Sequence, residues 1–428
     1  MIPAVIERCA GIDVHKKFVM VCVLIGPADS NPTPQIRRFS TFNAELERLR
    51  KWLLELQCNR VAMESTGPYW KPVFNVLEEA GIEMVLANPQ QVKNLRGHKT
   101  DPKDAHWLAH LFRHGMIRPS YIPPKPIREL RDLTRRRKQL VRNGAMERNR
   151  VQKLLEEANV KLGSVLSDVF GASGQDMVEA LVKGEATAEQ IAQLAQRKAR
   201  KKIPEIQKSI EGHRLNQTHR DLMQQCMTHL AFLEEQIEEI DQQIQNKIRS
   251  YGLSEAYELL QTVPGMQAEA AATVLAEVGA DVQAFPSAAK LSSWAGVCPG
   301  NNESAGKRKS SHTTKGNPYL REVLLECAWA SSRKKNSQMQ HRYRRLLGRR
   351  GKKRAAVAVA HALVQAVYYV LSTRKPFVDT AEPRRSPGQV RRLVRHHTRR
   401  LRKLDCWTRR TKSENKGNSM AQNQQTSG

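Results

Sequence analysis

The sequence predicts an α/β domain, then a helical middle region, then a mainly α-helical C-terminal domain. Three observations support this order. Strand patterns alternate with helix patterns over the first 122 residues, a proline-rich segment occupies 122–126, and apolar heptads fill 222–248. Strands that alternate with helices are typical of an α/β domain with a mixed sheet. Sustained heptads are typical of paired long helices.

Each element of the α/β domain follows from its own pattern. Residues 11–14 lead into a β-branched run at 18–25, which Gly26-Pro27 ends, and 38–42 resembles a further short strand. Leucines on one face predict a helix at 46–56. The remaining expected elements are a strand at 61–64, a helix at about 70–80 and a strand at 84–87.

The middle region, 123–253, is expected to be a coiled coil. Apolar residues recur every three or four positions from Leu130 to Ala158, although Arg137, Gly144 and Glu147 interrupt them. A cleaner heptad follows at Leu222, Cys226, Leu230, Leu233, Ile237, Ile240, Ile244 and Ile248. Such a seam can pair within one chain or between subunits. We favour an antiparallel hairpin that also supports dimerisation.

The C-terminal domain is expected over 254–375. Pro264-Gly265 separates two helix patterns, as in a helix-hairpin-helix that offers backbone N–H groups to phosphate. A plain packing hairpin explains the spacing equally well. Asn317-Pro318 is a good helix start, and another helix is expected at about 353–371. The segment 376–428 is polar and basic and predicts a flexible tail.

Charge and cysteine usage narrow the class of protein. Lys+Arg total 71 against 42 Asp+Glu, a net charge of +29, which favours a polyanionic partner because phosphate contacts release counterions. Charge alone does not separate DNA from RNA binders. The seven cysteines are scattered, with no C-x-x-C pair to suggest zinc. No signal peptide is recognised, and no apolar run approaches the roughly 18–20 residues that a membrane span needs, so we expect a cytoplasmic protein.

Four carboxylates of the first domain are candidate metal ligands. Asp13 lies in the first strand pattern, Glu64 ends a later one, and Asp101 and Asp104 open a helix pattern, on which they share a face. Phosphodiester chemistry with Mg²⁺ needs carboxylates that converge from separate elements. Each acid also has a structural explanation. Asp101 and Asp104 suit a helix start, and for that pair alone capping is the stronger interpretation.

The ordered motifs resemble a known family. Gly11-Ile12-Asp13-Val14, Glu64-Ser65-Thr66-Gly67 and the segment from Lys99 to Ala105 resemble the DEDD transposases of the insertion-sequence one-ten family. Later motifs resemble the C-terminal transposase domain of that family: Val263-Pro264-Gly265, residues 294–299 and residues 303–307. The resemblance covers the first 120 residues and about 255–375. Residues 163–205 and the basic tail match no motif of the family.

The resemblance implies a fold, an activity and partners. It implies that the N-terminal domain is RuvC-like, of the ribonuclease H fold, and that Asp13, Glu64, Asp101 and Asp104 bind Mg²⁺. It also implies that Ser304 is a serine nucleophile and that a structured bridge RNA guides the protein to donor and target DNA. Cations near Ser304 would bind nucleic acid, namely Lys307, Arg308, Lys309 and Lys315. From the sequence alone, Ser310 and Ser311 are rivals of Ser304.

The sequence therefore predicts a transposase that cuts and rejoins DNA as a homo-oligomer. One alternative is a RuvC-like structure-specific endonuclease, which needs only the carboxylates and leaves the Ser304 region unexplained. A second alternative is a non-catalytic nucleic-acid-binding relative. The presence of all four acids and of Ser304 counts against that last interpretation.

Overall fold

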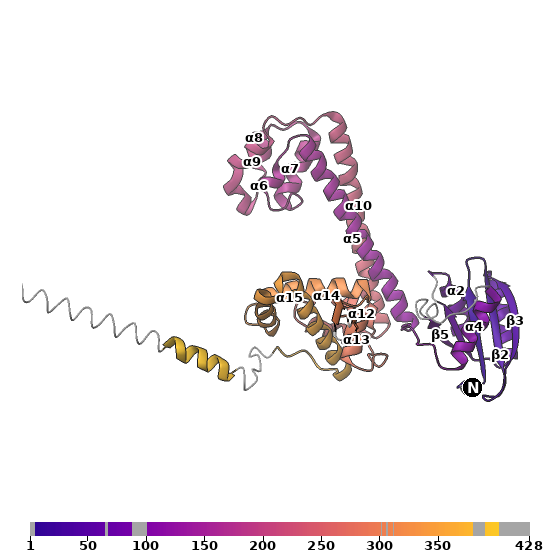
Figure 1. Ribbon diagram of the computed structural model, residues 1–428. Coiled ribbons are helices and arrows are strands. Elements are labelled where there is room, and N and C mark those ends of the chain that lie inside the picture. The colour runs from indigo at the N-terminus through magenta and orange to yellow at the C-terminus, as the bar shows by residue number, and fades with distance from the viewer. Residues whose placement is uncertain are drawn as a thin grey trace, which may run out of the picture. The chain divides into compact units, whose positions relative to one another are not determined.

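The computed structural model describes residues 5–64, 67–87, 101–300, 302–304, 307–310, 312–379 and 390–401. Side chains are not described at 101–102, 302–304 and 307–310. The chain divides into two compact units, Met1–Pro124 and Lys125–Gly428, each of which is treated by itself (Figure 1). Within the expected flexible tail, residues 390–401 are helical, and 402–428 lie outside the described residues.

The first unit is built on a five-stranded sheet. Its strand order is β3-β2-β1-β4-β5, with β1 to β3 antiparallel and β4 and β5 added in parallel beside β1. This is the strand order of a ribonuclease H fold, so the expected α/β domain is confirmed. The strands are β1 (Arg8–Val14), β2 (Phe18–Ile25), β3 (Thr33–Ser40), β4 (Arg60–Glu64) and β5 (Glu83–Ala87).

Helices cover both faces of this sheet. Alternate side chains of β1 and β4, such as Ile12 and Met63, join α1 (Asn43–Glu55) and α2 (Trp70–Glu78) in one core. The opposite face packs on α4 (Asp101–Arg113), where Ala62 belongs to a second core (Figure 1). This two-sided burial follows from the period of two along a strand.

Two long helices of the second unit form an antiparallel hairpin. They are α5 (Lys125–Glu157) and α10 (Gln217–Ser250). Their contacts run in reverse order along the chain: Lys247 with Glu129 at 2.6 Å, Asp241 with Arg137 at 2.5 Å, and His229 with Glu147 at 2.9 Å. The expected pairing within one chain is therefore present. That the hairpin also joins subunits stays a prediction.

A small helical module connects α5 to α10. It consists of α6 (Leu162–Val165), α7 (Ala172–Lys183), α8 (Ala188–Gln193), η1 (Arg197–Lys202) and α9 (Ile203–Ile210). Its core includes Leu162, Met177 and Ile206, all of them fully buried. The module contains the residues 163–205 that match no family motif.

The C-terminal part is mainly helical, as expected. Its elements are α11 (Ser254–Gln261), α12 (Ala268–Val278), α13 (Ala288–Trp294), β6 (Asn302–Ser304), β7 (Lys307–Ser310), α14 (Pro318–Arg333) and α15 (Gln338–Thr373). Gly265 lies between α11 and α12 with φ +78°. A Cβ there would lie 2.9 Å from the Ser331 nitrogen, so this turn packs directly on the backbone of α14.

Helix α15 corrects one expectation about apolar runs. It contains an 18-residue window of mean hydropathy 1.6, so by length and composition alone it could cross a membrane. However, 61% of that window is buried within the protein, with Val359, Leu363 and Val367 almost completely enclosed. A mostly buried helix of this kind is typical of a protein core.

Candidate active site

Asp13 and Glu64 end two neighbouring parallel strands. Strand β1 pairs with β4 in the register Gly11 to Ala62 and Ile12 to Met63, so the next step places Asp13 beside Glu64. Since side chains alternate along a strand, both acids point to the α4 face of the sheet. Glu64 is half-buried, and the Asp13 side chain is 18% exposed.

Helix α4 crosses this face in the opposite direction to β1. Arg113 donates to the carbonyl of Glu7 at 2.9 Å, and the Cys9 thiol lies 3.6 Å from the Ala109 carbonyl oxygen. Further along β1, a Cβ on Gly11 would come closer than 3.0 Å to backbone atoms of Ala105 and Ala109. Residue numbers thus fall along α4 while they rise along β1. The first turn of α4 therefore lies at the end of β1 that carries Asp13.

This geometry places the backbone of three acid-bearing segments, the ends of β1 and β4 and the first turn of α4, at one edge of the sheet. A turn of about four helix residues advances roughly 6 Å, about as far as two strand residues. The first turn of α4 starts at Asp101 and includes the exposed Asp104. Because Ala105 lies against Gly11, this turn lies further along β1, in the direction of Asp13. The side chain of Asp101 lies outside the described ones. We call Asp13, Glu64, Asp101 and Asp104 the carboxylate corner.

His15 is a neighbour of the corner that the sequence reasoning missed. Its Nε2 lies 3.0 Å from the Asp13 carboxylate, and its ring stacks on Phe18 with centroids 4.5 Å apart. The turn after β1 holds it there, because the backbone N–H of His15 donates to the Phe18 carbonyl. An imidazole beside a carboxylate can carry a proton or orient that carboxylate. The spacing Asp13-Val14-His15 was the available signal.

The donor chemistry of the corner suits a hard divalent cation. Mg²⁺ prefers carboxylate oxygens, which Asp13, Glu64 and Asp104 supply. Among the side chains that the structure describes, no three Asp, Glu, His or Cys residues are grouped closely enough to hold a metal ion. The residue types therefore fit such an ion, and the described side chains do not form a complete ligand set.

Ser304 lies in the second unit, at the end of a short strand. β6 and β7 form an antiparallel pair in which Ser304 faces Lys307 and Asn302 faces Ser310; we call this pair the serine hairpin. Ser304 is thus at the turn end of the pair and Ser310 at its base. Ser311 and the side chains of Ser304, Lys307, Arg308 and Lys309 lie outside the described part, whereas Lys315 is exposed.

The base of the serine hairpin is fixed by backbone contacts. The Gly300 N–H donates to the His312 carbonyl at 2.8 Å, and a bridge joins Pro299 to Thr313. Below them, a Cβ on Gly316 would come closer than 3.0 Å to backbone atoms of Gly296. Only glycine fits such an approach. The two chain segments that carry the hairpin are therefore locked together at its base.

A fully buried glutamate holds the segment that follows the hairpin. Asn317 caps α14 by accepting from the Leu320 N–H at 3.1 Å, and its amide donates to Glu277 at 2.6 Å. Glu277 has 0% exposure and also pairs with Arg135 at 2.8 Å and with Arg131 at 3.2 Å. A buried carboxylate is stable only when paired and hydrogen-bonded in this way. The network ties α5 and α12 to the start of α14.

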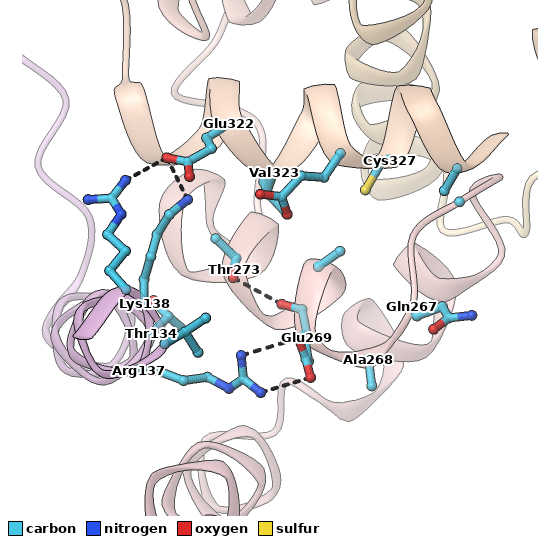
Figure 2. A pocket seen from close by; sticks show the side chains of 16 residues that line it. Thr134, Arg137, Lys138, Gln267, Ala268, Glu269, Thr273, Glu322, Val323 and Cys327 are labelled. Atoms are coloured by element: carbon cyan, nitrogen blue, oxygen red, sulfur yellow. Dashed lines mark hydrogen bonds and ion pairs between the residues drawn. The ribbon is translucent and has the colours of Figure 1, made fainter. Parts of the chain in front are cut away.

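A pocket of about 590 Å³ opens between α5, α12 and α14 (Figure 2). Figure 2 shows Arg137 facing both carboxylate oxygens of Glu269, the closer at 2.8 Å, and Lys138 reaching Glu322 at 2.8 Å. Glu269 lies in the first turn of α12, where a phosphate-binding hairpin would hold its anion. These contacts favour the packing interpretation of the Pro264-Gly265 hairpin.

Comparisons with known proteins follow the same division of the chain. A family model for DEDD transposases of the IS110 type, described as a transposase, matches residues 10–160. A second model, described as "Transposase IS116/IS110/IS902 family", matches residues 257–344. The chain belongs to this transposase family. The carboxylate corner lies within the first match, and the serine hairpin lies within the second.

One relative and two solved structures are similar to parts of this chain. The transposase is 23% identical over 329 residues to protein y4qE of Sinorhizobium fredii, described as a transposase; this spans 76% of the chain and 71% of that protein. It is also similar to RuvC of Thermus thermophilus, with 16% identity, 26% of this chain and 99% of that chain covered, and a TM-score of 0.21. RuvC of T. thermophilus in complex with a Holliday junction substrate matches with 16% identity and the same TM-score, over 27% of this chain and 100% of that one.

The family assigns a class of reaction to the chain. A transposase cuts and rejoins DNA, so this protein is an enzyme that acts on DNA. The small module and α10 fall between the two matched ranges, at residues 161–256, and α15 continues beyond the second.

Proposed function

We propose that this transposase breaks and rejoins DNA strands with two sets of groups, the Mg²⁺-binding carboxylate corner and the Ser304 hydroxyl. The observation that carries the proposal is the register of β1 and β4, which sets Asp13 beside Glu64 on the face crossed by α4. Cytoplasmic action and assembly as a homo-oligomer belong to the same proposal.

The carboxylate corner would hold the divalent ion on which transposases and nucleases of this kind generally depend. Asp13 and Glu64 are fixed by the sheet, and Asp104 adds a carboxylate from a separate element. The ion, when bound, would stabilise charge that develops on the phosphate oxygens. The His15 imidazole would orient the Asp13 carboxylate or exchange a proton with it.

Ser304 would conserve the energy of the broken bond. Its oxygen would attack phosphorus, so that an O–P bond forms as the bond to the departing DNA oxygen breaks, and that oxygen takes up a proton. A DNA hydroxyl would then attack the phosphoserine, restore a phosphodiester and release the serine hydroxyl. No ATP is needed, since bonds of one type are exchanged. Lys307 and Arg308, next in the sequence, would neutralise the phosphate.

A structured guide RNA completes the proposal. It follows from the family resemblance, and the net charge of +29 suits a protein that holds RNA and DNA together. The direct test is to purify the transposase from cells and to sequence the RNA that accompanies it. A single structured RNA encoded next to the gene is expected. Random cellular RNA would contradict the guide.

The test of the two groups uses labelled DNA from the flanks of the gene and a denaturing gel. Asp13→Asn should lower strand cleavage on the order of 100-fold or more, while the exposed Asp29→Asn in the same unit should not. Ser304→Ala should abolish both cleavage and the covalent protein–DNA product, and Ser310→Ala should spare them. An adduct that persists in Ser304→Ala would overturn the serine assignment. Cleavage without any adduct would favour the plain nuclease.

A further inference from the structure

One stretch of the transposase is strongly basic and contains no acid. Residues 327–378 include thirteen lysines and arginines and neither aspartate nor glutamate. The structure describes this whole stretch, from the end of α14 through α15. Such a sequence cannot compensate its charges locally, so any compensation must come from other parts of the chain or from a ligand.

Three arginines of this stretch lie along one face of α15. Arg342, Arg345 and Arg349 occupy helix positions i, i+3 and i+7, and we call them the α15 cationic stripe. Arg345 and Arg349 are exposed, and Arg342 is half-buried. Met339 and Gln340 of the same helix are buried, which leaves the stripe on the outer side. At Gly351 the backbone departs from the helix, with φ +76°.

The charges of the stripe are not matched by carboxylates in the part of the chain that the structure describes. Among the residues that the structure describes, no carboxylate forms an ion pair with any of the three arginines. Burial, and then the charge of Arg345, lower the pKa of Arg342. Burial, followed by Arg342, lowers the pKa of the His361 imidazole. Like charges on neighbouring turns of a helix repel one another, and a bound polyanion would offset this repulsion.

We propose that the α15 cationic stripe binds the phosphate backbone of duplex DNA, at a site distinct from the carboxylate corner and the serine hairpin. The stripe spans about 10 Å on a regular helix. The B-DNA major groove is about 12 Å wide and admits a helix between its phosphate rows, whereas the A-form RNA major groove is too narrow. The inference uses the DNA substrate of the family and does not depend on the Mg²⁺ or serine proposals.

The test measures binding and not cleavage, on the full chain with a chelator present. A short fluorescein-labelled DNA duplex and the RNA duplex of the same sequence are titrated at several salt concentrations. Arg345→Gln/Arg349→Gln should weaken binding to duplex DNA at least about tenfold at ~0.1 M salt and reduce the slope of log K against log salt by about 2. Arg345→Lys/Arg349→Lys keeps both charges and should retain most of that slope.

The matched control removes the same charge elsewhere. Lys153 and Lys161 are cations that already pair with Glu157 and Glu156. Lys153→Gln/Lys161→Gln should therefore leave the slope for duplex DNA nearly unchanged. An equal loss of affinity for duplex DNA in both double variants would show that only the total charge of the protein matters, and it would overturn the proposed site. A loss confined to the RNA duplex would overturn the choice of DNA. Because cleavage is not measured, failure of the Ser304 or Mg²⁺ proposal leaves this result unaffected.

Discussion

The carboxylate corner is positioned by apolar packing, whereas the segment after the serine hairpin is positioned by a buried polar network. At the corner, the absence of a side chain on Gly11 lets α4 touch β1, and alanine, leucine, cysteine and phenylalanine side chains fill the rest of that face. Beside the hairpin, the fully buried Glu277 pairs with Arg131, Arg135 and Asn317. Apolar contacts weaken gradually as volume changes, but a buried ionic network fails when one partner is lost.

The largest effect is expected from the polar network. Glu277→Ala would leave two arginines and the Asn317 amide without their shared acceptor, at a cost of about 3–5 kcal/mol in the free energy of unfolding. Chemical denaturation measures the loss. Glu322, which is 42% exposed and pairs with Lys138 and Arg142, is the control, and Glu322→Ala should cost less than about 1 kcal/mol. Equal costs for the two variants would contradict the network.

The close approach of α4 to Gly11 in β1 should be disrupted by one added methyl group. Gly11→Ala forces α4 away from β1 and should destabilise the first unit by about 1–3 kcal/mol, with loss of DNA cleavage because α4 carries Asp101 and Asp104. Gly163→Ala in α6 is the matched change, since its Cβ would meet nothing nearer than a Val169 methyl at 3.9 Å. Normal cleavage by Gly11→Ala would show that the corner does not need this contact.

Alkaline pH is expected to lower the stability of the first unit more than that of the second, by less than the two substitutions above. Burial is the main cause that raises the pKa of three thiols in the first unit, Cys9 and Cys22 to about 12 and Cys58 to about 11. In the second unit burial raises the pKa of one thiol, Cys327, to about 12. Because unfolded thiols ionise near 9, the stabilising effect of these protonated thiols is complete below pH 9 and is lost as pH rises toward 12.

The measurement compares chemical unfolding of the two units at pH 8 and pH 10. The first unit should lose more stability than the second, and Cys22→Ala should reduce the difference. At pH 8, the three thiols should react with a thiol reagent only after unfolding. Rapid labelling of native protein at these positions would contradict their burial.

Most of the sheet could be predicted because its inner strands are continuous apolar runs. The strand expected at 18–25 is β2 itself, and β4 and β5 begin one residue before their expected starts. The first strand is β1, which begins at Arg8 and not at Gly11. β3 was placed too late, at 38–42, because the edge strand Thr33–Ser40 is largely polar and exposed. Edge strands need little apolar surface, so hydrophobic patterning does not find their full length.

The paired helices show what a heptad pattern leaves out. Leu222 was assigned to the seam, but it is 42% exposed, and its neighbour Met223 is buried in the small module. Gly144 and Glu147, which interrupt the apolar spacing of α5, are both buried. Glu147 accepts hydrogen bonds from Arg150 and His229, so a polar layer takes the place of an apolar one. Partners from a distant helix cannot be recognised by spacing along one helix.

The candidate site, like the fold, could be predicted only in part from the sequence. The strand ends that carry Asp13 and Glu64 and the helix start at Asp101 could be predicted because they are local signals, and the backbone of the structure has these elements. The role of the acids as metal ligands stays a prediction. The role of Glu277 could not be predicted, because its partners come from a separate helix and a separate turn. His15 was missed although its contact with Asp13 is local. The metal, the nucleophile and the guide RNA stay predictions.

The junction of the small module with the helix hairpin has a consequence for how such a chain can change. Ala158 lies where the chain enters the small module, and Arg214 lies where it leaves. The Arg214 N–H donates to the Ala158 carbonyl at 2.8 Å. The two ends of the insert are therefore neighbours, and α5 and α10 meet along their own seam without it. Because its ends are adjacent, a single in-frame deletion or replacement in the gene could remove the small module or exchange it for a segment of another length. The hairpin would need only a short connecting loop in its place.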